Sequence, residues 1–313
     1  MDAVAGLLDG PRARGAFLLR SSMDPPWALR IQDDAPLTLV ALLRGEAWVT
    51  PDGGRAVRLG PGDVAIVRGP DPYEVADAPG TAPQAIIHPR QRCTTPGGDE
   101  LDRMTGQGVR TWGTGPDGAT QMLTGTYGLD GEVSRRLLRA LPPLLVLDAA
   151  SWETPLVALL GDEVVKDAPG QEAVLDRLLD LLLIAVLRAW FARPEAEAPG
   201  WYRAHGDPVV GPALRLMHHD PAHPWTVAAL AREIGVSRAG LARRFTELVG
   251  EPPMTFLTGW RLALAADLLR EPGATIGSVA EQVGYGSAFA LSTAFKRVRG
   301  VSPQQHRRRA VAA

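Results

Sequence analysis

The pattern of apolar and polar positions changes character about 130 residues along the chain. Before that point, short apolar runs such as 37–43 and 121–127 alternate with turn residues. Pro51-Asp52-Gly53-Gly54 is one such turn signal between two runs. Many short strands with frequent turns are typical of a β-barrel or sandwich. We therefore expect a barrel over about 15–130, with a long Gly-, Pro- and Thr-rich loop over 89–119.

From about 134 to 192 the apolar residues recur every three or four positions, which predicts helices. The segment 171–192 carries a stripe wider than one small barrel is expected to cover. A second copy of the chain or the rest of its own chain could bury it, and we interpret these segments as dimerisation helices. The segment that follows, 194–206, begins with the proline-bounded stretch Pro194–Pro199 and is expected to be a linker between domains 1–193 and 207–309. The stripe consists of Leu175, Leu178, Leu179, Leu182, Leu183, Val186, Leu187 and Trp190.

Residues 207–309 have helical periodicity throughout, and two stretches of this region repeat each other. Thr226–Ser237 and Thr275–Ser287 each combine a capping threonine, a short amphipathic segment, a glycine turn and a capping serine. A helix with apolar residues spaced by three or four follows each stretch. This is the helix-turn-helix pattern, present twice and joined by a helix over 256–269. The expected inward residues are Leu241, Phe245 and Leu248 in the first following helix, Leu291, Phe295 and Val298 in the second, and Trp260, Leu264 and Leu268 in the joining helix.

Charge is distributed unevenly between these two regions. Residues 201–313 hold 14 Lys and Arg against 8 Asp and Glu, a net charge of +6, so the rest of the chain, with 19 basic and 27 acidic residues, carries −8. A basic helical region behind an acidic one indicates that only the helical region meets a polyanion. In a helix-turn-helix unit the second helix enters the major groove of a duplex, and two such units meet successive grooves when they lie roughly 34 Å apart.

Nearly all of residues 200–308 resemble the AraC/XylS family of bacterial transcription regulators. The resemblance implies a sequence-specific regulator of transcription that binds double-stranded DNA, with RNA polymerase as a further partner if it activates. The motifs on which this resemblance rests include Gly235-Val236-Ser237-Arg238, Leu241-Ala242-Arg243-Arg244-Phe245, Gly250-Glu251-Pro252-Pro253, Trp260-Arg261, Val283-Gly284-Tyr285 and Phe295-Lys296-Arg297. By the same resemblance, base contacts are expected from Ala239, Ala242, Arg243, Ala288, Phe289, Ser292 and Thr293, and phosphate contacts from Arg238, Arg244, Lys296 and Arg297.

Three of these positions determine the expected specificity. Arg243 is the main candidate for a direct contact to guanine, because a guanidinium can donate two hydrogen bonds to its major-groove edge. Thr293 stands where an arginine is common in the family. Phe289 is unusual on a polar groove face, and it either packs against a thymine methyl group or packs inward.

The N-terminal region resembles the cupin-type sensor domain found in one branch of that family. This resemblance rests on Leu59-Gly60-Pro61-Gly62-Asp63-Val64, Arg68-Gly69, Gly125 with 137–147, and Leu187-Arg188-Ala189-Trp190. The resemblance implies an α+β multidomain protein: a cupin-like β-barrel with dimerisation helices, then an all-α domain of two helix-turn-helix units joined by a linker helix. A small-molecule effector is expected in the barrel, where Trp27, Trp48, Tyr73 and His88 either line its site or belong to the core.

Two further predictions for the N-terminal region depend on its possible metal ligands and on its cysteine. Tyr73 stands where metal-binding cupins commonly place a histidine, so we expect no metal, no cofactor and no enzymatic activity. Cys93 is the chain's single cysteine, which excludes an intramolecular disulfide and leaves a metal-free redox-responsive regulator as an alternative. A cupin enzyme fused to a DNA-binding domain is the other alternative. The first residues hold no long apolar segment and no apolar run approaches the roughly 20 residues that span a membrane, so we expect a cytoplasmic protein without a membrane partner.

Overall fold

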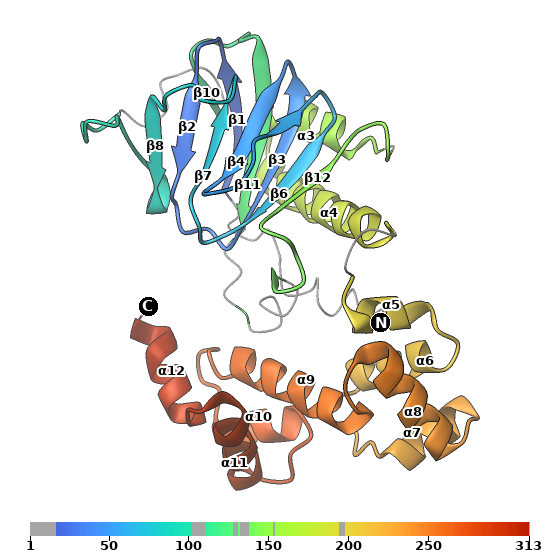
Figure 1. Ribbon diagram of the computed structural model, residues 1–313. Helices are drawn as coiled ribbons and strands as arrows, with labels where there is room; N and C mark the ends of the chain where they lie inside the picture. Colours follow the sequence, from blue (N-terminus) through green and yellow to red (C-terminus); the bar gives the residue numbers. More distant parts are fainter. Residues whose placement is uncertain are drawn as a thin grey trace. The chain divides into compact units, whose positions relative to one another are not determined.

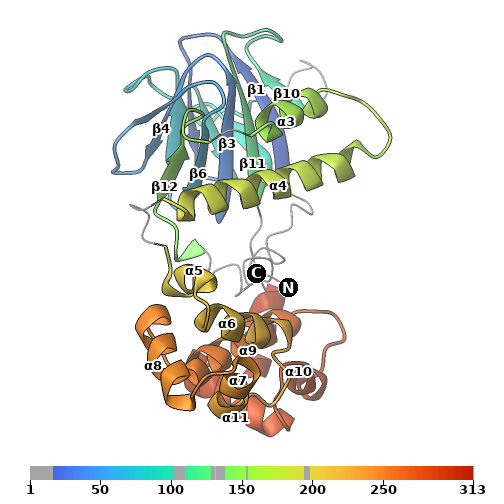
Figure 2. The same cartoon turned by 90° about the vertical axis from the view of Figure 1, so that its right-hand side faces the viewer.

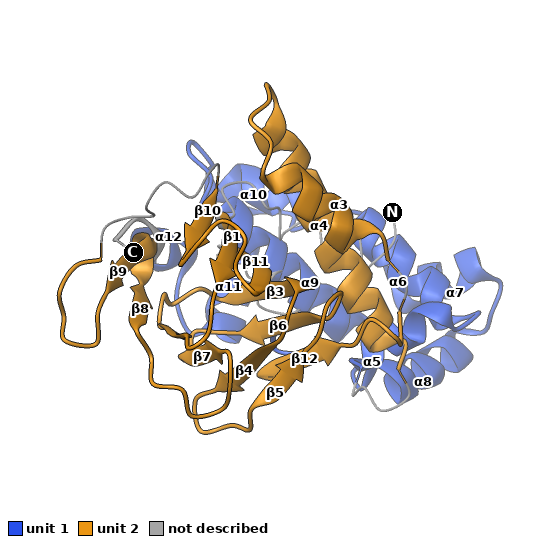
Figure 3. Ribbon diagram, turned by 90° about the horizontal axis from the view of Figure 1, so that it is seen from above, with its two compact units in different colours: residues 1–10, 130–140, 197–313 blue, residues 11–129, 141–196 orange. Residues whose placement is uncertain are grey.

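The computed structural model in Figure 1 describes residues 17–101, 110–127, 131, 138–152, 154–193 and 198–312. These residues form two compact units, coloured separately in Figure 3. One unit contains the described strands together with helices α3 (Leu156–Val164) and α4 (Gln171–Phe191). The other contains the helices from α5 (Gly200–Arg203) to α12 (Pro303–Ala312).

The strands of the N-terminal unit pair into two six-stranded sheets. The first sheet has the order β10 (Thr111–Gly113), β1 (Phe17–Met23), β11 (Thr120–Tyr127), β3 (Leu37–Arg44), β6 (Val64–Arg68) and β12 (Leu144–Leu147). The second has the order β5 (Val57–Leu59), β4 (Ala47–Pro51), β7 (Tyr73–Ala76), β2 (Ala28–Ile31), β8 (Ala85–His88) and β9 (Arg92–Thr94).

The core of this unit lies between the two sheets. Val40 and Leu42 of β3 point into it together with Val49 of β4 and Val75 of β7. The alternate residues of β3 point to the opposite face of the first sheet, yet Leu39 is also fully buried. A strand buried on both faces has a nearly continuous apolar sequence, which explains the run of 37–43, where Thr38 is the one polar residue.

Helices α3 and α4 cover the outer face of the first sheet (Figure 2). The hydroxyl of Tyr127 in β11 donates a hydrogen bond to the carbonyl oxygen of Leu179 in α4, at 2.9 Å. Gly125 lets α4 approach closely, because a Cβ at that position would lie 2.8 Å from Leu179 Cδ1. The chain itself therefore buries most of the α4 stripe. Val174 and Leu181, which lie outside that stripe, are 45% and 51% exposed.

Three expectations from the sequence need correction. The expected loop over 89–119 contains strands β9 and β10, and the expected helical segment over 134–192 contains strand β12, which pairs antiparallel with β6. A four-residue apolar run such as Leu144–Leu147 has too few residues for its period to distinguish strand from helix. The expected linker 194–206 is helical from Gly200 onward, in α5 and the 3₁₀ helix η2 (Ala204–Gly206), and Trp201 belongs to the core of the C-terminal unit.

Four helices of the C-terminal unit, α7, α8, α10 and α11, begin at the caps that the sequence predicts. Thr226, Ser237, Thr275 and Ser287 each accept a hydrogen bond from the backbone N–H three residues later. The helices are α6 (Val210–His219), α7 (Val227–Ile234), α8 (Arg238–Val249), α9 (Pro253–Leu268), α10 (Ile276–Gln282) and α11 (Ala288–Arg299).

Helix α9 contributes to two separate hydrophobic cores and lies between the two helix-turn-helix units (Figure 1). Phe256, Leu257 and Trp260 pack with α6, α7 and α8. Leu262 and Ala266 pack with α10 and α11. The expected single apolar side of this helix is therefore wrong, because α9 buries two different sides. Since both helix-turn-helix units pack on the same rigid helix, α9 fixes the separation between α8 and α11.

Candidate nucleic-acid interface

Helices α8 and α11 have the same local design, so their surfaces can be compared position by position. Each has 12 residues, follows a capping serine and ends at a glycine in the left-handed conformation. Ser287 lies 50 positions after Ser237, and the same offset relates the exposed residues Ala239 and Phe289. The fully buried pairs that fix both helices in register are Leu241 with Phe245 and Leu291 with Phe295.

The outward face of α8 carries one long side chain among small ones. Ala239 is exposed, Ala242 is half-buried, and Arg238 is exposed at the start of the helix. The Arg243 side chain is 78% exposed, and its Nε lies 3.8 Å from Glu247 Oε1. An exposed pair at that distance contributes little, so the guanidinium can leave Glu247 and reach into a groove.

Arg244 has a different environment from the one that the sequence suggested. Its guanidinium donates hydrogen bonds to the Asp207 carboxylate at 2.6, 2.9 and 3.1 Å. Asp207 also accepts hydrogen bonds from the backbone N–H groups of Val209 and Val210 at the start of α6, both at 2.9 Å. These bonds favour a structural role for Arg244, which ties α8 to α6, over the phosphate contact that we expected.

We predict that Asp207→Asn destabilises the C-terminal unit in a pH-dependent way. The Arg244 guanidinium, which hydrogen-bonds to the Asp207 carboxylate, lowers its pKa to about 2 from 3.8. Because the pKa is lower in the folded state, the stabilisation is fully present above pH about 4 and disappears as the pH falls towards 2. At pH 7 we expect a loss of about 1 kcal/mol in the free energy of unfolding, less than the full shift implies because Arg244 is half exposed.

Urea unfolding of the variant and the parent between pH 7 and pH 2.5 measures this difference. Asparagine can still accept the hydrogen bonds at the start of α6 through its Oδ1, so the comparison isolates the charged, hydrogen-bonded pair with Arg244. Arg244→Gln should cause a similar loss, and the double variant should lose little more than either single variant. A difference that stays constant across the pH range would contradict the prediction.

The outward face of α11 combines an aromatic ring with short polar and basic side chains. Phe289 is 80% exposed, which excludes the inward packing that the sequence left open. Ala288, Thr293, Lys296 and Arg297 are also exposed, and Ser292 is half-buried. Val298 is 55% exposed, so its expected place in the apolar stripe is wrong.

A contact that the sequence did not predict joins the two helix-turn-helix units. Arg261 of α9 donates hydrogen bonds to the carbonyl oxygens of Pro221 and His223, both at 2.7 Å, in the loop between α6 and α7. Gly284, in the turn of the second unit, lies against the same loop, because a Cβ added there would be 2.6 Å from the carbonyl oxygen of Ala222. Burial lowers the pKa of Arg261, and Tyr285 and Asp220 oppose this shift. The loop, α9 and the second turn thus hold α8 and α11 in a fixed relation.

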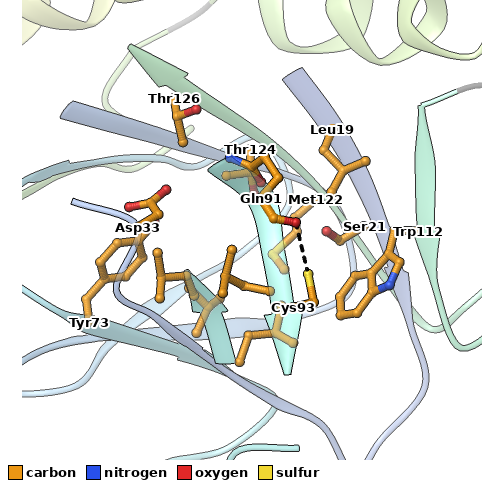
Figure 4. A pocket seen from close by; sticks show the side chains of 14 residues that line it. Leu19, Ser21, Asp33, Tyr73, Gln91, Cys93, Trp112, Met122, Thr124 and Thr126 are labelled. Atoms are coloured by element: carbon orange, nitrogen blue, oxygen red, sulfur yellow. Dashed lines mark hydrogen bonds between the residues drawn. The ribbon is translucent and has the colours of Figure 1, made fainter. Parts of the chain in front are cut away.

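The N-terminal unit contains a cavity between its sheets, of about 50 Å³ (Figure 4). This is several times the roughly 10–15 Å³ that one water requires. Tyr73 and Asp33 lie at one end, while Cys93 and Trp112 lie at the other. Most of its other lining residues, such as Met122, are apolar.

Only one of the four expected effector residues lines this cavity. Tyr73 does, whereas Trp27, Trp48 and His88 do not. Cys93, which was expected as a redox site, also lines it. Trp27 is a fully buried core residue, Trp48 is half-buried, and the His88 ring forms hydrogen bonds with Gln32 and Thr94. Sequence reasoning missed Asp33, Trp112 and Met122, and Trp112 lies in strand β10, which we had assigned to a loop.

The chemistry of the cavity suits an uncharged ligand. Burial raises the pKa of the Tyr73 phenol, so the group stays a neutral hydroxyl. Burial also raises the pKa of the Asp33 carboxyl, which accepts a hydrogen bond from the Ala35 backbone N–H at 3.1 Å. The Cys93 thiol is 7% exposed and donates to the Gln91 carbonyl oxygen at 3.7 Å. The walls therefore offer apolar area with a few hydrogen-bonding groups.

Within the described ranges, no three His, Cys, Asp or Glu side chains gather as a metal site would require. In the same part of the chain, every helix is too short or too polar to span a bilayer.

Comparisons with known proteins agree with this two-part architecture. Residues 2–192 match the family described as Cupin, and residues 230–309 match the one described as Helix-turn-helix domain. A protein of Streptomyces lividans described as an AraC-like transcription regulator is 34% identical over 90% of both chains. The transcriptional regulator AlkR of Acinetobacter baylyi is 26% identical over 98% of this chain and 99% of its own. The DNA-binding domain of AdpA, solved with a target DNA, is 30% identical over 34% of this chain and 96% of its own, with a TM-score of 0.32.

Proposed function

Because this chain belongs to the AraC-type family of DNA-binding transcription regulators and has a cupin domain at its N-terminal side, we propose that it is an effector-responsive homodimer. Residues 1–193 sense the effector and pair the subunits, and residues 207–309 bind the operator. The observation that carries the effector proposal is the mostly apolar cavity between the two sheets. The relatives are transcription regulators, which supports a regulatory role and not an enzymatic one. A regulator of bacterial promoters works in the cytoplasm, and RNA polymerase is a further partner if this one activates.

In this proposal the recognition helices α8 and α11 make different contacts with the operator. Arg243 of α8 reads a guanine, with Ala239 and Ala242 small enough to let the helix lie deep in the groove. Lys296 and Arg297 of α11 contact phosphates, as does Arg238 of α8. The exposed Ala288, Phe289, Ser292 and Thr293 form the base-facing surface of α11. Arg261 and Gly284 keep the two helices at the separation that successive grooves require.

The apolar face that α4 leaves exposed is the proposed contact with the second subunit. Val174, Leu178, Leu181 and Ala185 follow one another at spacings of four, three and four, which places them on one side of the helix. Val174 and Leu181 are about half exposed in the single chain, and a twofold-related copy would cover both. An operator-bound pair of subunits would then be sensitive to any change of the barrel that moves α4.

We predict that Leu181→Glu dissociates the dimer. The variant places a carboxylate in the middle of an apolar contact, so burying its charge is costly. The side chain is 51% exposed in the single chain, so the fold of each subunit should survive. Sedimentation velocity of the full chain should show a dimer for the parent and a monomer for the variant.

The control for this prediction is Arg55→Gln, which also changes the net charge by one unit. Arg55 is exposed between β4 and β5 of the same unit, away from α4. This variant should remain a dimer. Identical sedimentation of the parent and Leu181→Glu would show that α4 is not the subunit contact.

The single cysteine gives a direct test of where the effector binds. Cys93 lines the cavity and is 7% exposed, so its reaction with iodoacetamide reports access to that space. We predict that a compound that alters operator affinity also slows alkylation of Cys93, because the bound molecule fills the space that the reagent needs. Mass spectrometry of timed samples measures the rate.

Alkylation of urea-unfolded protein, with and without the same compound, is the control and should show no difference. A compound that changes operator affinity at a given concentration but leaves the Cys93 rate in the folded protein unchanged would place the effector elsewhere. A change of operator affinity that follows oxidation of Cys93 without any added compound would favour the redox-responsive alternative.

A further inference from the structure

One large apolar side chain in the described part of the chain is far more exposed than the others. Phe289 is 80% exposed, whereas the next values for large hydrophobic residues are 55% for Val298 and 51% for Leu181. An isolated exposed apolar residue is ordinary, but a nearly free aromatic ring on a recognition helix needs a partner that is not water.

The position of Phe289 shows which surface the ring belongs to. It is the second residue of α11, and Thr293 and Lys296 lie four and seven positions later, on the same side of the helix. Leu291 and Phe295, which are fully buried, anchor the opposite side. The ring therefore stands in the row of side chains that ends in the exposed ammonium of Lys296, on the face suited to a polyanion.

The chemistry of a duplex offers one apolar group to such a ring. Among the base edges in the major groove, only thymine presents a methyl group, and the other edges present hydrogen-bond donors and acceptors. The equivalent residue of α8 is Ala239, whose methyl side chain is too short for the same reach. Thr293 and Ser292 are also short, so they leave room for the ring to lie along the groove.

We propose that Phe289 packs on the C5-methyl group of a thymine and makes α11 specific for that base. This inference rests on the proposed function only in that α11 enters the major groove. The adjacent Lys296 and Arg297 favour a nucleic acid as the partner over an apolar protein surface, because both cations would remain unpaired against the latter. The two recognition helices then read different bases, a guanine by α8 and a thymine by α11.

Deoxyuridine tests this proposal, because it lacks only the methyl group of thymidine and keeps the base pair. A duplex is first selected by the full-length protein, and each thymine of the box bound by α11 is then replaced singly by deoxyuridine. We expect one replacement to weaken binding about three- to tenfold, the effect of removing one methyl contact. Phe289→Ala should weaken binding to the thymine duplex similarly and should show no further loss on the deoxyuridine duplex.

Two controls make the result specific. Val298→Ala truncates the other large exposed apolar side chain of α11 and should leave the deoxyuridine effect intact. Thermal unfolding of Phe289→Ala should match the parent, since the ring contributes little buried area. Equal weakening of the variant on both duplexes, or no deoxyuridine effect for the parent, would overturn the thymine contact while leaving duplex binding in place. Unchanged duplex affinity with lost promoter activation would overturn it in favour of a protein partner, whereas absence of any duplex binding by the parent would contradict the proposed function itself.

Discussion

Replacing Arg243 with alanine is expected to weaken binding to the preferred operator by about 5- to 150-fold, or about 1–3 kcal/mol. The guanidinium is 78% exposed, its distance of 3.8 Å from Glu247 marks a weak pair, and small residues flank it on α8. A bidentate contact to one guanine carries both affinity and selectivity. The variant should therefore lose its preference at a single base pair and retain it elsewhere.

The measurement is a set of binding isotherms on the selected operator and on its single-base variants. Arg238→Ala is the matched control, because Arg238 is an exposed arginine on the same helix with an expected phosphate contact. It should weaken all sequences alike and reduce the salt dependence of binding by about one ion. If Arg243→Ala behaves in the same sequence-independent way, Arg243 contacts a phosphate and not a base.

Gly284→Ala is expected to destabilise the C-terminal unit strongly. Gly284 has φ of +78°, which costs an alanine about 1–2 kcal/mol. The added Cβ would also lie 2.6 Å from the carbonyl oxygen of Ala222 and 2.9 Å from a guanidinium nitrogen of Arg261. Because backbone cannot move aside cheaply, we expect a total loss of about 2–5 kcal/mol in the free energy of unfolding.

Gly235→Ala is a matched control within the same chain. Gly235 ends α7 in the first unit as Gly284 follows α10 in the second, and its φ of +76° is nearly the same. No heavy atom would lie within 4 Å of its added Cβ, so only the conformational cost applies. The difference between the two variants in urea unfolding therefore measures the contact between the second turn and the loop before α7. If Gly284→Ala and Gly235→Ala lowered the free energy of unfolding equally, the contact between the second turn and the loop before α7 would contribute nothing to stability.

The same pair of variants bears on DNA binding. If Gly284→Ala displaces the second unit from the loop, α11 no longer meets its groove when α8 is bound. Affinity for a site with both boxes should then fall roughly tenfold or more beyond the loss for Gly235→Ala, while affinity for a single α8 box should change little. The geometry between the units, and not only the side chains on them, thus determines operator recognition.

Much of the C-terminal unit was predictable from the sequence because its signals are local. A serine or threonine that caps a helix acts on an N–H three residues away, and Thr226, Ser237 and Ser287 all do so. Helical periodicity likewise identified Leu241 and Leu291 as buried. These features depend on neighbours within one or two turns, which the sequence states directly.

The exceptions depended on partners far away in the sequence. Arg244 was expected to contact a phosphate, but its guanidinium donates hydrogen bonds to the carboxylate of Asp207, 37 positions earlier. Helix α9 buries two sides because two cores form against it. The short run Leu144–Leu147 became a strand because β6 offered it an edge. None of these partners can be identified from local periodicity.

The sequence by itself therefore determined the double helix-turn-helix, its caps and the residues that face outward from α8. It also indicated a barrel ahead of these helices. Only the tertiary structure decided which residues surround the cavity and which cations are already paired. It alone revealed the contact of Gly284 with the loop that Arg261 holds. The physical reason is the range of the interactions: caps and amphipathic faces follow from residues three or four apart, whereas cavities and ion pairs depend on which distant segments the fold brings together.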